Sequence, residues 1–454
     1  MKQTIKNIIS LLPAFVLIAA AGCTHDTDGL EEVKSSPVAT AEVFIDAFTA
    51  DLQYAAFGGS DVKAFDVDTE VKYKGASSMK ITVPDENTFA GGTYYSTFGR
   101  DLSGYNCLTF WAKATKRASI DEIGFGVDME ENKYKVSVFD LAVNTNWKKY
   151  YIPIPAPAKL QSEKGLFFFG EGPEDGAGYT FWIDELKFEN LGTIAHPQPK
   201  ILNGATEIIS LFAGLNFPVT GSETFNLPDG TNRDITLSAA YFDFVSSGEN
   251  AATVSNEGVV TAHSNGSAEI TAEMNGIKAA GSLKVHSVAD FAPAPARDPA
   301  SVISIFSDAY TNRPVDYFNG YWEWQTTQTS EFNVNGDNIL RYTNFNFVGA
   351  GFPAVDASAM SHIHFDVYLP AETTGARLKI KLLDFGPNDV DDGGNIDDGI
   401  ATQTFDLVPG QWNPLEMSIE SMRPRDKVRL IAYDNDAGYF SNFYLDNIYF
   451  YKEE

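Results

Sequence analysis

Aromatic and amide side chains are concentrated in residues 317–325, which read Tyr-Phe-Asn-Gly-Tyr-Trp-Glu-Trp-Gln. If this segment is a strand, Trp322 and Trp324 point to one face, because side chains alternate along a strand. The opposite face then carries Tyr321, Glu323 and Gln325. Flat rings cover the C–H faces of an uncharged sugar, and amide and carboxylate groups bond its hydroxyls. The segment therefore predicts a platform for a neutral saccharide, with burial of both indoles in a core as the alternative.

Other polar and aromatic residues suit the same chemistry. Asn344 and Asn346 alternate with phenylalanines, so they are expected on the solvent face of a strand, where they bond hydroxyls or remain solvated. In the first third of the chain, Tyr94 or Tyr95 must face away from the core. Trp111 is expected on that same outer face, which makes the three residues a second candidate site.

The first residues predict export. Lys2 and Lys6 precede an apolar run from 8 to 20, which is followed by small residues and Cys23. This is the pattern of a secretory signal peptide and is too short for a comfortable membrane span. With cysteine at the cleavage point it resembles a bacterial lipoprotein signal, which implies lipidation of Cys23. Acidic residues after Cys23 resemble the signal that Bacteroidetes use to place lipoproteins on the outer face of the cell.

Charge and composition limit the ligand class. The 454-residue chain has 61 acidic and 33 basic residues, a formal charge of −28, and 13% aromatic residues. Such a chain repels nucleic-acid phosphate and anionic lipid head groups. We therefore expect no nucleic acid as partner, contact with the membrane only through the lipid anchor, and a neutral ligand.

The composition and motifs of the sequence predict an all-β protein of three domains. Aromatic and glycine-rich composition without long helical patterns favours β-sandwiches. Proline-rich segments at 193–199 and 292–299 predict linkers. The expected parts are a signal peptide at 1–22, a flexible tether at 23–40, and domains at 41–192, 200–288 and 300–454.

The first and third domains share an order of elements. Each closes on a similar strand, Tyr179–Phe188 in one and Asn442–Phe450 in the other, and each has a Trp-containing strand before it, near Trp147 and Trp412. The order and spacing predict a diverged duplication of one sandwich domain.

These segments also resemble known families. The closing strands, with Asp184 and Asp446 at matching positions, resemble β-jelly-roll carbohydrate-binding modules of the galactose-binding-like type. Residues 252–272 are similar to the group-2 bacterial Ig-like fold. The resemblance implies two jelly-roll sandwiches separated by an Ig-like domain. It further implies a surface glycan-binding lipoprotein of the outer membrane that takes a neutral β-glucan such as laminarin, with an outer-membrane glycan transporter as a partner.

A structural calcium ion is a further expectation from this resemblance. Related sandwiches hold an ion between their opening and closing strands through oxygen ligands, which hard cations prefer. The matching positions are Asp308 and Asp446 in the third domain, and Asp46 and Asp184 in the first.

Two other function classes remain open. A jelly-roll hydrolase or lyase needs carboxylates placed across a cleft, but the sequence has no Gly-x-Ser-x-Gly or His-Glu-x-x-His motif. Cys107 lies in a strand-like run and is expected to pack as a small apolar residue. His362 and His364 share a strand face, but the sequence has no third metal ligand nearby. An adhesin or scaffold that binds protein partners is the second alternative.

Overall fold

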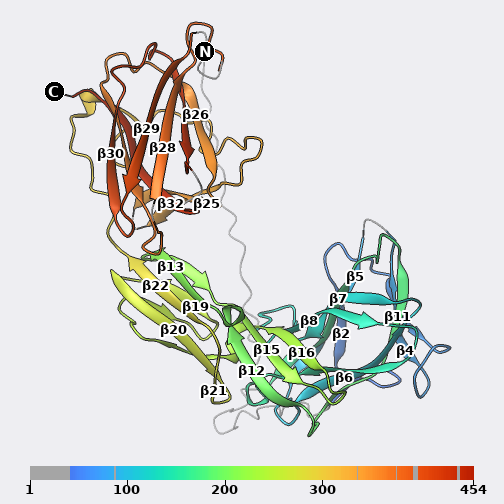
Figure 1. The fold of residues 1–454 in the computed structure, drawn as a ribbon. Helices are drawn as coiled ribbons and strands as arrows, with labels where there is room; N and C mark the ends of the chain where they lie inside the picture. The colour runs from blue at the N-terminus through green and yellow to red at the C-terminus, as the bar shows by residue number, and fades with distance from the viewer. Residues whose placement is uncertain are drawn as a thin grey trace, which may run out of the picture.

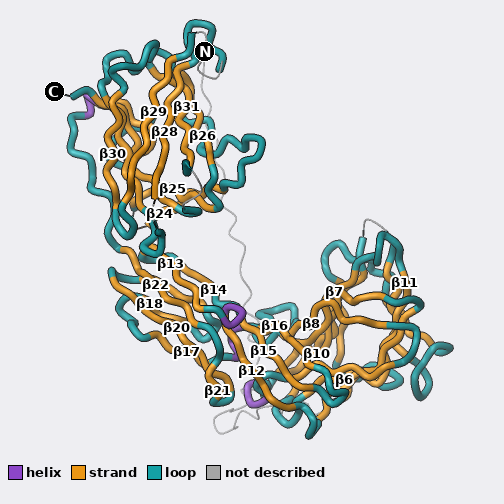
Figure 2. The backbone as a smooth tube through the Cα atoms, viewed as in Figure 1, coloured by secondary structure: helices purple, strands orange, loops and turns teal. Residues whose placement is uncertain are grey.

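The computed structural model describes residues 41–85, 88–334, 336–374, 376–391, 397–436 and 440–453. The predicted signal peptide, the tether and Cys23 lie outside these ranges. Within them the molecule is bent, with one sandwich at each end and an Ig-like part between (Figure 1). Figure 2 shows that strands dominate. The helical segments described are four 3₁₀ turns: η1 (Pro157–Lys159), η2 (Leu202–Gly204), η3 (Ala239–Tyr241) and η4 (Pro299–Ser301). No helix in the described ranges is long and apolar enough to span a bilayer.

The first sandwich packs two antiparallel sheets face to face. One sheet has the order β3 (Phe65–Asp68), β4 (Ser78–Val83), β11 (Tyr179–Glu189), β6 (Cys107–Ala114) and β9 (Lys148–Pro153), with β1 (Glu42–Phe44) paired to β11. The facing sheet has the order β2 (Leu52–Ala56), β5 (Ala90–Arg100), β10 (Glu163–Glu171), β7 (Ala118–Phe125) and β8 (Val136–Val143).

The third part repeats this strand order. One sheet runs β24 (Gln328–Val334), β25 (Asp337–Thr343), β32 (Phe443–Tyr451), β27 (His362–Tyr368) and β30 (Trp412–Ser418), with β23 (Val302–Phe306) paired to β32. The other runs β26 (Phe347–Val355), β31 (Val428–Asp434), β28 (Ala376–Asp384) and β29 (Gly399–Leu407). Each strand has a counterpart in the first sandwich, so β26 corresponds to β5 and β29 to β8. The all-β architecture and the shared element order are confirmed.

The middle part is Ig-like and shares a sheet with the first sandwich. Its own sheets are β13 (Thr206–Phe212), β22 (Ser282–Val288), β20 (Gly266–Met274) and β17 (Asp243–Ser246), with β21 (Ile277–Lys278), and β14 (Asn216–Pro218), β19 (Val259–Ala262) and β18 (Ala252–Val254). A further set, β12 (Ala195–Ile201), β15 (Gly221–Asn226) and β16 (Asn232–Leu237), continues the sheet of β8.

The proline-rich segment 193–199 is therefore not the predicted linker. Most of it forms β12, whose Gln198 and Lys200 pair with Thr224 and Ser222 of β15. Strand β12 is an edge strand, where proline is tolerated because an edge strand has N–H groups that face away from the sheet.

Strand alternation builds the cores. In β4, Met79, Ile81 and Val83 are buried, whereas Thr82 between them is exposed. Both sandwiches fill their interiors mainly with Phe, Leu, Ile, Val and Ala side chains. Burial of this apolar area drives the two sheets together.

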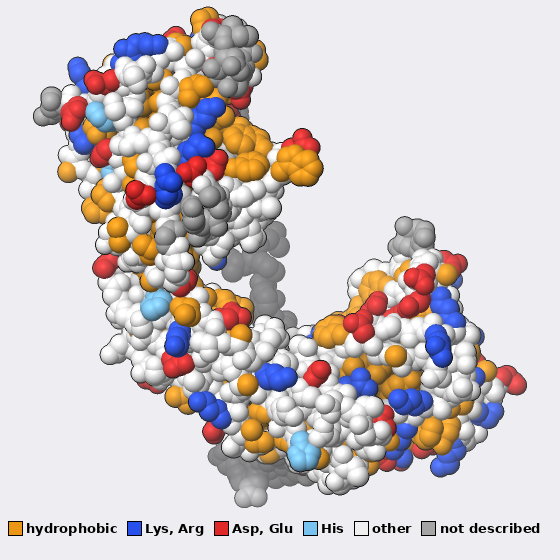
Figure 3. Space-filling model, in the orientation of Figure 1, with side chains coloured by type: hydrophobic (Ala, Val, Ile, Leu, Met, Phe, Trp, Pro, Cys, Tyr) orange, Lys and Arg blue, Asp and Glu red, His pale blue; other side chains and the backbone are white. Residues whose placement is uncertain are grey.

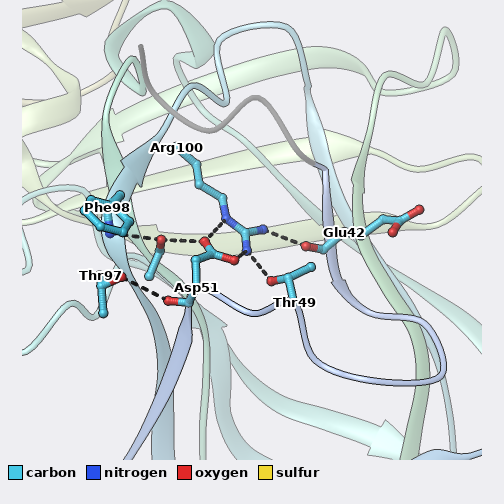
Figure 4. A network of polar contacts seen from close by, with 7 residues as sticks. Glu42, Thr49, Asp51, Thr97, Phe98 and Arg100 are labelled. Atoms are coloured by element: carbon cyan, nitrogen blue, oxygen red, sulfur yellow. Dashed lines mark hydrogen bonds and ion pairs between the residues drawn. The ribbon is translucent and has the colours of Figure 1, made fainter. Parts of the chain in front are cut away.

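A buried ion pair fixes the opening strand to β5 (Figure 4). Arg100 is fully buried and bonds both carboxylate oxygens of Asp51, at 2.9 and 2.8 Å. Its Nη1 donates to the carbonyl of Glu42 in β1 at 2.6 Å, and Ser96 donates to Asp51 at 2.6 Å. Two parallel bonds of this kind are strong and orient the guanidinium. The pair therefore holds the entry of the chain in place.

An aromatic contact joins the Ig-like part to the third sandwich. Phe212, at the end of β13, is fully buried, and its ring centroid lies 4.9 Å from that of Tyr444 and 5.3 Å from that of Tyr368. Ser210 adds a hydrogen bond from its hydroxyl to Glu372 at 2.8 Å. This junction is packed like a domain core, so it restricts relative motion of the two parts.

Candidate functional site

Aromatic rings lie along β26 on the outer face of its four-stranded sheet. Gly349 and Gly351 face outward, because the residues that alternate with them fill the core: Val348, Ala350 and Phe352. Trp322 lies directly over Gly349, and Tyr317 lies over Gly351, so that a Cβ at either glycine would collide with the ring above it. Glycine within a strand commonly permits such a close approach. The two rings and Phe347 form what we call the aromatic strip.

The loop that supplies these rings is not the predicted strand. Residues 317–325 lie in the connection between β23 and β24. Tyr321 and Trp324 have φ values of 49° and 69°, which break the side-chain alternation of a strand. The prediction that Trp322 and Trp324 share a strand face is therefore wrong, although both rings lie on the outside of the sandwich.

Two residues predicted to bind ligand instead shape this loop. Asn346 donates from Nδ2 to the carbonyl of Trp324 at 2.8 Å and accepts from the N–H of Thr326 at 2.9 Å. The Gln325 side chain accepts from the N–H of Trp322 at 3.3 Å and donates to the carbonyl of Thr327 at 3.2 Å. Their amide groups are used within the protein, so Asn346 and Gln325 are positioning residues.

The exposed part of the loop carries the side chains free to meet a ligand. Trp324 is 81% exposed and Tyr321 is 76% exposed. Glu323 and Asn344 are also exposed, with Asn344 in the bend between β25 and β26 rather than in a strand. Trp322 is partly buried and stacks on Phe347, with ring centroids 6.3 Å apart. Trp324 is therefore the ring that projects furthest into solvent.

Polar residues lie beside the aromatic strip on the same face. In register across the sheet, Phe347 is followed by Asp434, Lys379 and Thr404. The next row runs from Gly349 through Ala432, Lys381 and Thr402. Figure 3 shows this arrangement, with hydrophobic side chains over β26 beside basic and acidic side chains over β28 and β31. Lys379 lies 3.6 Å from Asp434, so the face combines a flat apolar surface with donors and acceptors but little net charge.

The first sandwich has an equivalent surface built from different residues. Gly91 of β5 lies beneath the rings of Phe89 and Phe57, much as Gly349 lies beneath Trp322. Tyr94 is buried, so its predicted role in binding is wrong, whereas Tyr95 is half-buried on the outer face. Sequence reasoning missed Phe57 and Phe89. The signal for them was the glycine pair before the tyrosines, which marks a strand that a ring approaches closely.

Trp111 does not share that face. It belongs to β6 of the opposite sheet, so the prediction that it accompanies Tyr95 is wrong. Tyr73 stacks on Trp111 at a centroid distance of 3.8 Å and an interplanar angle of 11°. Trp147 packs edge-on against Tyr73 at 6.0 Å. One face of the Trp111 indole is therefore already occupied by a side chain of the protein.

Carboxylates converge at the base of the third sandwich. In the described part of the chain, no group of three His, Cys, Asp or Glu side chains is placed to hold a metal ion as it stands. Asp308, Asp337 and Asp446 nevertheless line one cavity of about 180 Å³. Burial and the charge of Asp337 raise the pKa of Asp446 to about 8. Burial and Asp308 raise the pKa of Asp337 to about 6.

This donor set fits a hard cation in its chemistry. Among the described residues none donates a hydrogen bond to the buried Oδ2 of Asp337. Mutual repulsion of three carboxylates is relieved when a divalent cation binds between them, and calcium prefers such oxygen ligands. Asp337 was not recognised in the sequence, because only register with β32 brings it near Asp446.

The corresponding residues of the first sandwich serve the backbone. Asp184 accepts hydrogen bonds from the N–H groups of Tyr73 and Lys74, at 2.7 and 3.1 Å, and burial raises the pKa of its carboxyl group. Asp46 accepts from the N–H of Ser77 at 3.1 Å. Both carboxylates hold the loop that carries Tyr73, and their role in calcium binding stays a prediction.

Other reactive groups have partners of their own. His364 lies 3.3 Å from Asp366 and 2.9 Å from Glu416. Although burial opposes the charged imidazole, these two carboxylates raise its pKa to about 9. The His364 imidazole is therefore engaged by two carboxylates of the protein. Cys107 is fully buried, which confirms that it packs as a small apolar residue, and burial raises the pKa of its thiol to about 12.

Comparison with known proteins gives two family matches. Residues 44–190 match the family described as Carbohydrate binding domain 30, and residues 234–285 match Bacterial Ig-like domain (group 2). The predicted Ig-like fold and the kinship of the first sandwich to carbohydrate-binding modules are thereby confirmed. A search among curated proteins finds no significant match.

Similar solved structures include carbohydrate-binding modules and also glycoside hydrolases, such as a β-1,2-glucanase from Parabacteroides distasonis. The family 30 module of a cellulosomal cellulase of Clostridium thermocellum is 19% identical, with 34% of this chain and 95% of that chain covered, at a TM-score of 0.24. A family 11 module of the same organism, solved with a β-1,3-1,4-mixed-linked tetrasaccharide, is 17% identical, with 29% and 85% covered, at 0.22. The tandem family 22 modules of Paenibacillus barcinonensis Xyn10C are 12% identical, with 92% and 99% covered, at 0.24. These values are too low to transfer a ligand to this chain.

Proposed function

We propose that this protein binds a neutral polysaccharide without cleaving it. The single observation that carries the proposal is the projecting Trp324 ring, held beside the aromatic strip by Asn346. The family match of residues 44–190 supports carbohydrate binding in the first sandwich. A β-glucan such as laminarin is the ligand we favour, because the exposed aromatic rings of the third sandwich suit the flat faces of an uncharged sugar.

The proposed affinity follows from the exposed rings. A ring that covers roughly 100 Å² of sugar contributes about 2.5 kcal/mol at about 25 cal/mol per Å². This corresponds to roughly a sixtyfold change in the dissociation constant. Each site alone is then weak, and the protein gains avidity when both sandwiches bind one polymer.

Affinity electrophoresis in gels that contain laminarin, mixed-linkage glucan, xylan, mannan or alginate tests the proposal. The parent protein should be retained in a gel that contains one of the neutral polysaccharides, and Trp324→Ala should lose most of that retention. Val245→Ala is the matched control, because Val245 is an apolar side chain 61% exposed on the Ig-like part. Equal retention of the Trp324→Ala variant and the parent would refute the site.

The charged groups on the face favour binding over hydrolysis. Glycosidases need one protonated and one ionised carboxyl group across the scissile bond. Here Asp406 lies 3.5 Å from Arg377 and Asp434 lies 3.6 Å from Lys379, so both carboxyl groups on this face are paired with basic side chains. A glycan panel assayed for new reducing ends tests this part of the proposal, since any turnover contradicts it.

We further propose that the protein is a lipoprotein anchored through Cys23 in the outer membrane and facing the exterior, where it supports glycan capture for an outer-membrane transporter. The sequence of residues 1–23 supports this placement. Cys23→Ala should release the protein from the membrane fraction. Copurification of a transporter together with no hits on a glycan array would favour the scaffold alternative.

We also propose that the third sandwich binds a structural calcium ion. Asp308, Asp337 and Asp446 would hold the ion, which would supply positive charge between the opening and closing strands of the third sandwich. Calcium should raise the melting temperature of the parent protein relative to EDTA, and Asp337→Asn should remove most of that increase. A melting temperature that does not respond to calcium would contradict this assignment.

A further inference from the structure

The sheet of the first sandwich does not end at the domain boundary. Thr236 and Leu237 of β16 pair with Ser137 and Val136 of β8. The main-chain N–H of Ser238 then donates to the carbonyl of Lys135 at 2.9 Å. Strands β15 and β12 extend the same sheet, which therefore has eight strands in all (Figure 1).

Side-chain contacts fix this seam. Tyr241 is fully buried, and its ring is tilted against that of Tyr134 with the ring centroids 5.2 Å apart. Its hydroxyl donates a hydrogen bond to the Tyr134 carbonyl at 2.9 Å. Asn275 donates from Nδ2 to the carbonyl of Pro155 at 2.7 Å. Lys159 lies 2.9 Å from Asp243. The Ig-like strands therefore present a fixed surface beside β8.

The outer faces on both sides of the seam form one hollow of about 370 Å³. Phe139 of β8 contributes an aromatic ring that is 52% exposed. The remaining lining includes Ser137, Thr236, Ser222, Asn203, Lys200 and Asp234. Lys200 donates a hydrogen bond to Thr224 at 3.1 Å, and Thr224 in turn donates one to Asp234. The opposite charges of Lys200 and Asp234, which both line the hollow, are therefore connected through Thr224 and offset each other.

This hollow lies in line with the outer face already described for the first sandwich. Register connects Thr93, Phe168, Gly124, Ser137, Thr236 and Ser222 in one row across the sheet. Adjacent strands lie about 4.8 Å apart, so the five strands of the sandwich span about 19 Å and all eight span about 34 Å. A polymer that crosses the strands meets one continuous surface.

We propose that the glycan-binding surface of the first sandwich continues across the seam, so that Phe139, Thr236 and Asn203 form additional subsites for a neutral polysaccharide. This inference rests on the proposed function. The exposed ring supplies an apolar face, the hydroxyl and amide groups bond sugar hydroxyls, and the offset charges suit an uncharged chain. The Ig-like part is then part of the binding surface and not only a spacer.

Binding of β-glucan oligosaccharides of increasing length tests the inference by calorimetry. The full chain carries Trp324→Ala throughout, which removes the contribution of the third sandwich. Phe139→Ala should weaken binding of the longest oligosaccharides about tenfold, since a ring of this exposure buries a modest apolar area. Binding of a tetrasaccharide, which fits within the sandwich itself, should not change.

Two further variants make the result specific. Thr236→Val keeps the shape of the side chain but removes its hydroxyl, and should also weaken only the longer ligands. Phe98→Ala is the matched control, because Phe98 is 63% exposed in β5 of the same sheet but does not line the hollow. The Phe98→Ala variant should bind short and long ligands as tightly as the Trp324→Ala background does. Unchanged binding of long ligands by Phe139→Ala and Thr236→Val, or a Trp324→Ala background that binds no oligosaccharide, overturns the inference. The proposed function itself is refuted if the protein with Trp324 intact binds no oligosaccharide of any length.

Discussion

Glu223 provides a sharp test of the structure, because it is a buried acid beneath the shared sheet. It lies in β15 between Pro199 of β12 and Ile235 of β16, and only 1% of it is exposed. No residue in the described ranges donates a hydrogen bond to its buried Oε2. Burial raises its pKa from 4.5 to about 8, because a charged carboxylate is poorly solvated there.

This shift makes stability depend on pH. The folded protein keeps the proton of Glu223 up to about pH 8, whereas the unfolded chain releases it above pH 4.5. Below pH 4.5, Glu223 is protonated in both states and its ionisation costs the folded state nothing. As pH rises from 4.5 toward 8, the buried Glu223 progressively lowers the free energy of unfolding. At about 1.36 kcal/mol per pKa unit, the cost is about 3 kcal/mol at pH 7 and about 5 kcal/mol above pH 8.

Glu223→Gln should remove this cost while keeping the shape of the side chain. We expect nearly equal free energies of unfolding for variant and parent near pH 4.5, and a variant more stable by about 3 kcal/mol at pH 7. Denaturant unfolding followed at several pH values measures this difference, with Glu273→Gln as the control, since Glu273 is an exposed glutamate of the Ig-like part. A difference between Glu223→Gln and the parent that does not change with pH would refute the burial argument.

Two other predictions follow from the same structure. Phe212→Ala should remove about 3–5 kcal/mol of packing energy at the junction with the third sandwich. Small-angle scattering should then show a larger radius of gyration while the circular dichroism spectrum stays unchanged. An unchanged radius of gyration would contradict a rigid junction. His364, whose pKa is about 9 against 6.5 unfolded, should stabilise the fold fully below pH 6.5 and lose that contribution as pH rises through 9. The stability difference between parent and His364→Gln should shrink over this range, and a constant difference would count against the ion pairs with Asp366 and Glu416.

Local patterns were sufficient for most of the fold. Alternating apolar residues and two similar closing strands predict a pair of sandwiches, and the register of β11 and β32 confirms their equivalence. The error at 193–199 had a physical cause. Proline normally indicates a linker, but Pro197 and Pro199 lie in an edge strand.

The candidate sites were harder to predict because ring orientation depends on distant contacts. Either Tyr94 or Tyr95 had to face the core, and pairing of β5 with β10 and β2 decided that Tyr94 does. A period of two placed Trp322 and Trp324 together, yet backbone turns at Tyr321 and Trp324 orient each ring separately. Nothing local to Trp111 indicates that Tyr73, in another loop, stacks on it.

The sequence by itself determined the types of chemistry available, namely exposed indoles, amides and carboxylates on an acidic chain built of strands. The tertiary structure alone decided which of these groups share a surface. Side-chain direction within a strand is a local property, but the neighbours of each strand and the anchoring of each loop depend on pairing between residues far apart in the chain. Asn346 holding the Trp324 loop, Asp337 reaching Asp446, and β16 joining β8 are all contacts of that kind.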